Sequence, residues 1–234
     1  LLSVIQNWKH KQHMDLSRES RIGSDEFKVR RELQPAIRSY VSTLIDGWDR
    51  AAKRYCVKDP TLNYFIPDLS QLYSNYKFIL MVRDPRASLN SLLNRIKHFE
   101  PRHLILKAIE MNETLVRSVR NCRAVGANNC KVVFYEHLVL NKTRVLRSVL
   151  KFLDIEWHDA ILSHEKFFGT RVTIDQTEWS NDQISKPIYN DSLSVWSRNL
   201  TSEQLVILKK HLTCLTELGY DPDSLTSFNT NPID

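Results

Sequence analysis

Arg83, Ser91 and Arg95 are the residues of this chain best suited to binding an anion. Arg83 directly follows an apolar run, whereas Ser91 and Arg95 lie four residues apart and would share one face of a helix. Arginine presents planar, permanently charged donors that match the oxygens of a phosphate. Two cations and a hydroxyl that face one crevice therefore predict a phosphate site. The alternative is an ordinary strand, loop and helix with solvated arginines.

The elements that would position these residues follow from the sequence between residues 78 and 96. Residues 78–82, FILMV, form an apolar run of the length expected for a buried strand. Pro85 suits the first position of a helix, and apolar residues recur at helical spacing from Ala87 to Ile96. A strand that leads directly into a helix would place Arg83 at the carboxyl end of a sheet, where open α/β proteins bind ligands.

The rest of the chain alternates helical patterns with short apolar runs. We expect a loop at 169–190, a frayed polar tail at 224–234, strands at 54–57 and 131–135, and helices at 1–19, 25–50, 62–73, 102–125, 143–153, 158–167 and 202–218. Pro67 lies near the middle of one expected helix, where proline is unfavourable. Strands that alternate with long helices indicate a layered α/β fold with a mainly parallel sheet.

Composition narrows the classes of ligand and partner. The net charge of +6 favours anionic ligands or acidic partners. The basic residues form no block and no aromatic-interleaved stripe, so we expect no nucleic acid as partner. No apolar run is long enough to span a membrane, and no signal-peptide pattern is present, although the chain starts on Leu-Leu and a targeting segment could precede it. The histidine pairs at 10 and 13 and at 158 and 164 lack further ligands at matching spacing, so we expect no metal.

Glycine is scarce and widely spaced in this chain. The five glycines are Gly23, Gly47, Gly126, Gly169 and Gly219, each more than 20 residues from the next. The common phosphate-binding loops need several glycines close together. Residues 1–234 therefore cannot build such a loop.

Cysteines and asparagines indicate the cellular compartment of the protein. Cys122 and Cys130 flank the short segment RAVGANN, and a disulfide there would contribute about 2–3 kcal/mol in the chain-entropy model. The alternative is two free thiols, as in a cytosolic protein. The N-glycosylation pattern occurs four times, at Asn112, Asn141, Asn190 and Asn199. Together these features favour a secretory-pathway lumen.

Two further segments carry groups that suit an anion. Lys58 follows the expected strand at 54–57, and residues 180–187 form the polar loop SNDQISKP. For Lys58, the alternative is a lysine at a helix start, with Asp59 as the capping residue. For the loop, the alternative is ordinary polar surface.

Six segments, in this order and spacing, closely resemble the protein-tyrosine sulfotransferases. The resemblance extends from near residue 1 to about residue 222. It is carried by YCVKDPT, KFILMVRDPRASLNSLLNR, the Cys122 and Cys130 pair followed by VVFYEHLVLN, VLKFLDIEW, SNDQISKP and LGYDP.

The resemblance implies transfer of a sulfuryl group from 3′-phosphoadenosine-5′-phosphosulfate to the hydroxyl of tyrosines in acidic stretches of secretory proteins, without a metal. Arg83, Ser91 and Arg95 match the family's contacts to the 3′-phosphate of the donor, in agreement with the anion site inferred above. Tyr135 matches a tyrosine that contacts the nucleotide.

The polar loop and one lysine complete the implied site. Lys58 and Ser180 match the residues that stabilise charge on the transferring sulfonate. The loop that closes over the donor would comprise Ser180, Asn181, Asp182, Gln183, Ile184, Ser185, Lys186 and Pro187. The disulfide pairing of Cys122 with Cys130 also fits the family.

The resemblance also implies a P-loop-like sulfotransferase fold, in which helices flank a central, mainly parallel sheet. We expect residues 1–222 to form the C-terminal two-thirds of that domain, and residues 223–234 a polar tail. The family's first strand, its glycine-containing phosphate loop and its catalytic glutamate would precede residue 1, which would leave Cys56 without its disulfide partner. Pro85 stands where the family usually has glycine, and Val195 where it usually has a nucleotide-contacting lysine.

Partners and compartment follow from the same resemblance. It implies a homodimer in the Golgi lumen, of the single-pass type II membrane class, although residues 1–234 include no anchor. The alternative function is a catalytically impaired or inactive relative that binds nucleotide or peptide without sulfating it.

Overall fold

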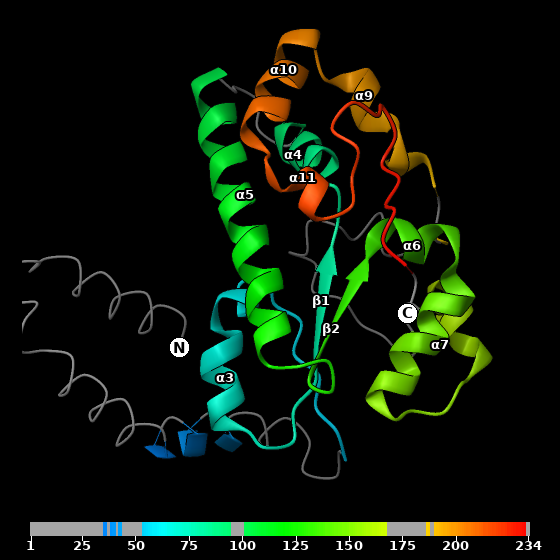
Figure 1. Cartoon of the computed structure of the whole chain (residues 1–234). Coiled ribbons are helices and arrows are strands. Elements are labelled where there is room, and N and C mark those ends of the chain that lie inside the picture. Colours follow the sequence, from blue (N-terminus) through cyan, green and yellow to red (C-terminus); the bar gives the residue numbers. More distant parts are fainter. Residues whose placement is uncertain are drawn as a thin grey trace, which may run out of the picture. The chain divides into compact units, whose positions relative to one another are not determined.

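The structure is a computed structural model, drawn in Figure 1, and it describes residues 35, 36, 38–40, 42, 43, 53–94, 101–167, 186, 187 and 190–232. The chain divides into two compact units. One comprises Leu1–Asp59 with Gln71–Ser74, and the other comprises Pro60–Ser70 with Asn75–Asp234. The expected helix at 1–19 lies outside the described residues.

In the first unit, the described residues between 35 and 43 are helical, as expected for the helix at 25–50. Residues 54–57 have no regular structure and are exposed, so the strand expected there is wrong. Tyr55 and Val57 are of residue types that favour strands, but a strand is stable only when it pairs into a sheet, and the sheet of the described residues consists of residues 78–82 and 130–134. Cys56 is an exposed free thiol.

Two parallel strands form the sheet of the second unit, β1 (Phe78–Val82) and β2 (Cys130–Phe134). Their register pairs Phe78 with Cys130 and Val82 with Phe134, so both strands end at the same edge, as Figure 1 shows. The expected parallel α/β arrangement is confirmed. Alternate side chains of β1 point to opposite faces. Leu80 and Val82 are buried, whereas Ile79 and Met81 are 42% and 47% exposed, so β1 is not buried on both faces as its apolar run suggested.

Helices α4 (Pro85–Leu93) and α5 (Pro101–Ala124) follow β1 in the chain, and α5 packs against both strands. α4 begins where the sequence predicted, because Pro85 occupies the first turn and the Asp84 side chain accepts a hydrogen bond from the Arg86 backbone N at 2.9 Å. The hydrophobic core consists of apolar side chains from β1, β2, α4, α5 and the C-terminal helices. Among them are Val82, Leu89, Leu104, Ala108, Leu208 and Leu215.

Shorter elements precede and follow this core. The helix expected at 62–73 divides into the 3-10 helix η2 (Leu62–Phe65) and α3 (Ile66–Leu72). Pro67 is tolerated because it falls in the first turn of α3. After β2 come α6 (Tyr135–Leu140), α7 (Lys142–Leu153), the 3-10 helix η3 (Asp159–Phe167), the 3-10 helix η4 (Asp191–Leu193) and α9 (Val195–Asn199).

The last expected helix, 202–218, is two helices. α10 (Ser202–His211) begins with a capping box between Thr201 and Gln204, and α11 is Cys214–Glu217. The break is stabilised from α5, since Asn112 Oδ1 accepts a hydrogen bond from Cys214 N at 2.8 Å. A contact so distant in the sequence supplies the acceptor that a helix start needs.

A disulfide joins the end of α5 to the start of β2. Cys122 and Cys130 are bonded, with 5.3 Å between their Cα atoms, and both are buried. The intervening turn depends on Gly126, whose φ of +87° lies in the left-handed region that favours glycine.

The C-terminal segment is ordered where the sequence predicted fraying. Ser227 and Asn229 are each 2% exposed, Tyr220 pairs with Asn229 in an isolated bridge, and Thr230 N donates to Gly219 O at 2.9 Å. The expected frayed tail is therefore wrong over residues 224–232. Its polar composition is explained by side chains that form buried hydrogen bonds. Among the residues that the structure describes, no helix is both long and apolar enough to cross a membrane.

Candidate active site

Arg83 and Tyr135 meet at the carboxyl edge of the sheet. Arg83 is the first residue after β1, and Tyr135 is the first after β2. Because the register places Val82 opposite Phe134, the residues that follow must lie at one edge. The Arg83 guanidinium carbon lies 4.7 Å from the centroid of the Tyr135 ring, a cation–π contact. Two residues that sequence reasoning assigned to one nucleotide site are thus brought together.

Ser192 of η4 is a third member of this cluster, and sequence reasoning missed it. Its hydroxyl is hydrogen bonded to the Tyr135 hydroxyl at 2.8 Å. Its carbonyl accepts a hydrogen bond from Arg83 Nη2 at 3.4 Å. The local sequence marks this serine only as the third residue of the Asn190 sequon, because its contacts join segments that are far apart in the chain.

The Arg83 side chain retains unused donor capacity. Its Nε is buried and has no hydrogen-bond partner among the described residues. A buried guanidinium N–H without a partner is costly, and an anionic ligand would satisfy it. The donor chemistry of Arg83 therefore fits a phosphate at the carboxyl ends of β1 and β2.

The other expected site residues are only partly described. Ser91 lies on α4 and is half-buried. Lys58 is exposed and belongs to the first unit, and Lys186 and Pro187 are exposed. Arg95 and the remaining loop residues Ser180, Asn181, Asp182, Gln183, Ile184 and Ser185 lie outside the described residues.

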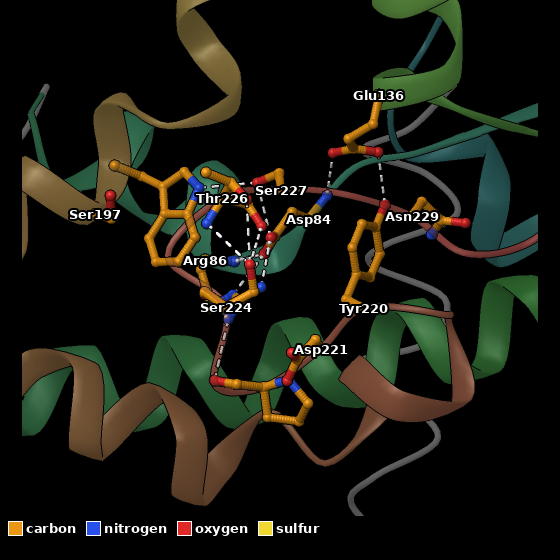
Figure 2. Close-up of polar contacts among 12 residues, drawn as sticks. Asp84, Arg86, Glu136, Ser197, Tyr220, Asp221, Ser224, Thr226, Ser227 and Asn229 are labelled. Atoms are coloured by element: carbon orange, nitrogen blue, oxygen red, sulfur yellow. Dashed lines mark hydrogen bonds and ion pairs between the residues drawn. The ribbon is translucent and has the colours of Figure 1, made fainter.

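Beside the cluster, a buried ion pair supports the start of α4, as Figure 2 shows. Asp84 Oδ1 accepts from Arg86 Nε at 3.1 Å, and Asp84 Oδ2 accepts from Arg86 Nη2 at 2.9 Å and from Ser227 Oγ at 2.8 Å. Arg86 Nη1 donates to the carbonyls of Pro222 and Ser224 at 3.2 and 3.0 Å. Arg86 is therefore a structural cation that attaches the C-terminal segment, in contrast to its neighbour Arg83.

Glu136 links the two strand ends beside this pair. Its Oε1 accepts from Asp84 N at 2.9 Å, and its Oε2 accepts from the Tyr220 hydroxyl at 2.7 Å, the contacts drawn at the right of Figure 2. Burial raises the pKa of the Glu136 carboxyl above its ordinary value of 4.5, although the two hydrogen bonds oppose this. Burial and the neighbouring Glu136 charge also raise the pKa of Tyr220. These residues hold the carboxyl edges of β1 and β2 together.

Comparison with known proteins agrees with this geometry. The family model described as "Sulfotransferase family" matches residues 4–159, more than half of the chain. The chain belongs to the sulfotransferase family. Protein-tyrosine sulfotransferase 1 of Homo sapiens is 34% identical over 228 residues, a match that covers 95% of this chain and 60% of the relative. Protein-tyrosine sulfotransferase A of Caenorhabditis elegans is 33% identical over 192 residues, which cover 81% of this chain and 50% of the relative.

A solved structure supports the sulfotransferase fold. The sulfotransferase domain from the curacin biosynthetic pathway superposes with a TM-score of 0.52 at 17% sequence identity, and it covers 79% of this chain and 68% of that domain. The fold class predicted from the sequence is therefore confirmed. The chain spans about half the length of the Caenorhabditis elegans relative.

The four sequons of this sulfotransferase chain differ in exposure. Asn141, Asn190 and Asn199 are exposed. Asn112 is half-buried in α5, and its Oδ1 accepts from Cys214 N and, at 3.4 Å, from Thr213 Oγ1. Glycosylation at these positions stays a prediction.

Proposed function

We propose that this protein transfers the sulfuryl group of 3′-phosphoadenosine-5′-phosphosulfate to the hydroxyl of tyrosines in acidic stretches of secretory proteins. Arg83 and Tyr135 would bind the donor, with Arg83 at its 3′-phosphate. Ser91, Arg95 and residues 180–187 would complete the donor site, as the resemblance implies.

The observation that carries this proposal is the Arg83 guanidinium at the carboxyl edge of the sheet. It stacks on Tyr135 and keeps its buried Nε without a partner among the described residues. Open α/β folds bind ligands at this edge. The relatives named above are protein-tyrosine sulfotransferases, which supports tyrosine as the acceptor.

The proposed reaction is an in-line displacement, close in physics to phosphoryl transfer. The tyrosine oxygen forms a bond to sulfur while the bond between sulfur and the bridging oxygen of the 5′-phosphate breaks. The tyrosine proton passes to a general base, because a phenol with a pKa of about 10 is a poor nucleophile at neutral pH. Lys58 and Ser180 would stabilise the negative charge that develops on the transferring sulfonate and the leaving phosphate.

The proposed setting is the Golgi lumen, with the protein acting as a homodimer on acidic substrates. The Cys122–Cys130 disulfide suits an oxidising compartment. The net charge of +6 suits substrates rich in Asp and Glu.

The test is transfer of radiolabelled sulfate from the labelled donor to an acidic peptide with a single tyrosine. The protein is expressed in the secretory pathway of animal cells, with any native sequence that flanks residues 1–234 retained. We expect label on the tyrosine peptide and none on the peptide with phenylalanine in its place. Arg83→Ala should abolish transfer, whereas Arg120→Ala, at an exposed position of α5, should not.

Two results would overturn the proposal. If the parent protein binds nucleotide but transfers no sulfate, the result would favour the alternative function, that of a relative that binds nucleotide or peptide without sulfating it. Transfer that survives Arg83→Ala would show that the donor site has been placed wrongly.

A further inference from the structure

We propose that Ser192 is a positioning residue of the donor site, which holds the Tyr135 ring and through it the Arg83 guanidinium. This inference rests on the proposed function, because it concerns how the same nucleotide is held.

Ser192 contacts both site residues at once, by different groups. Its hydroxyl is bonded to the Tyr135 hydroxyl at 2.8 Å, and its backbone carbonyl accepts from Arg83 Nη2 at 3.4 Å. Ser192 lies 109 residues after Arg83 and 57 after Tyr135. Three distant segments therefore meet, and the side chain of Ser192 connects η4 to the tyrosine.

Ser192 is itself held in place by the next residue. The Leu193 carbonyl accepts from Ser227 N at 2.8 Å and from Trp196 Nε1 at 3.1 Å, and Leu193 N donates to Asn190 O at 3.0 Å. Trp196 is 1% exposed, so this attachment point lies in the core. Because the backbone next to Ser192 is held in place, the Ser192 hydroxyl can in turn hold the Tyr135 hydroxyl that it binds.

The orientation of the tyrosine ring decides where the arginine donors point. The Arg83 guanidinium stacks on the ring at 4.7 Å, so a rotation of the ring would move the guanidinium and its unpartnered Nε. The bond from Ser192 stabilises one orientation of the ring before the ligand arrives. Ligand binding then loses less side-chain conformational entropy, which is the physical basis of preorganisation.

The experiment measures the affinity for adenosine 3′,5′-bisphosphate by titration calorimetry in a set of variants. Ser192→Ala is made in the Asn190→Gln background, so that it and its parent both lack the sequon at Asn190. It removes the hydroxyl and leaves the carbonyl contact, and we expect the affinity to fall about fivefold, the usual effect of one hydrogen bond. Ser192→Thr keeps a hydroxyl and should restore most of the affinity. Ser197→Ala is the matched control, because the Ser197 hydroxyl is half-buried like that of Ser192 but donates to the Ser194 carbonyl at 2.9 Å.

A double-mutant cycle with Tyr135→Phe separates positioning from general loss of structure. In the Tyr135→Phe background, Ser192→Ala should change the affinity by less than about 1.5-fold, since the bond it removes is already gone. A full additional loss in that background, or an unchanged affinity in Ser192→Ala alone, overturns the inference while leaving the proposed function intact. Absence of nucleotide binding by the parent protein overturns both.

Discussion

Arg86→Met tests the buried ion pair that supports the candidate site. The Arg86 guanidinium donates twice to the Asp84 carboxylate, at 3.1 and 2.9 Å, and also to the carbonyls of Pro222 and Ser224. It lies 4.5 Å from the centroid of the Trp196 ring. Its side chain is 4% exposed and that of Asp84 is 0% exposed, so solvent screens neither charge.

The expected cost follows from what the substitution leaves behind. Methionine retains much of the apolar contact with Trp196 but removes four hydrogen bonds. The Asp84 carboxylate remains buried with neutral donors alone, the Ser227 hydroxyl and the Arg86 backbone N–H. Removing one partner of a buried pair costs about 3–5 kcal/mol, because the other charge is left uncompensated. This is a large part of the free energy of unfolding of an ordinary domain, about 5–15 kcal/mol.

Urea unfolding at neutral pH measures this cost, and two controls make it specific. Asp84→Asn in the Arg86→Met background removes the stranded charge and should recover at least about 1 kcal/mol. Lys209→Met breaks the exposed pair with Asp223 and should cost at most about 1 kcal/mol. The reasoning is refuted if Arg86→Met lowers the free energy of unfolding by less than about 1 kcal/mol, or if Asp84→Asn gives no recovery.

Three further substitutions test other parts of the account by the same unfolding assay. Because burial raises the pKa of Glu136, the fold favours its neutral form, and ionisation weakens the parent protein as the pH rises above 4.5. Glu136→Gln should therefore gain stability relative to the parent as the pH rises above 4.5, and a stability difference that is independent of pH would contradict this. Replacing Cys122 and Cys130 by serine should lower the free energy of unfolding by about 2.5 kcal/mol, for a disulfide that joins residues 8 apart. Cys56→Ser changes an exposed free thiol and is the control, and an equal loss there would contradict this prediction. Gly219→Ala should lower the free energy of unfolding by about 1–2 kcal/mol, because the φ of Gly219 is +82° and the new Cβ would lie 2.5 Å from Asn231 Nδ2. Gly126 also has a positive φ, but a Cβ there would meet no atom within 4 Å, so Gly126→Ala measures the cost of the backbone conformation alone.

The strand and helix around Arg83 could be predicted because their signals are local. An apolar run followed by Pro85 places the start of α4, and the bounds of β1 match residue for residue. The meeting of Arg83 and Tyr135 follows from the parallel pairing of β1 with β2, which places Val82 opposite Phe134. In contrast, the roles of neighbouring arginines could not be separated, since only tertiary contacts make Arg86 a buried structural group and leave Arg83 with an unpartnered donor.

The features that sequence reasoning missed depend on partners distant in the chain. Ser227 looked like part of a polar tail because its acceptor, Asp84, lies 143 residues earlier. The break before Cys214 depends on Asn112 in α5, and the bond of Ser192 depends on Tyr135. Such hydrogen bonds determine which polar residues are buried, but they do not change the local sequence pattern of apolar and polar residues.

The central claim is that Arg83 recognises the 3′-phosphate of the donor nucleotide. Titration calorimetry that compares adenosine 3′,5′-bisphosphate with adenosine 5′-monophosphate tests it most directly. We expect the parent protein to prefer the bisphosphate by at least about tenfold, the usual value of a charged hydrogen bond, and Arg83→Ala to lower that preference by about tenfold, with Ser91 and Arg95 accounting for what remains. Equal affinities in the parent protein, or a preference for the bisphosphate that is undiminished in Arg83→Ala, would contradict the account.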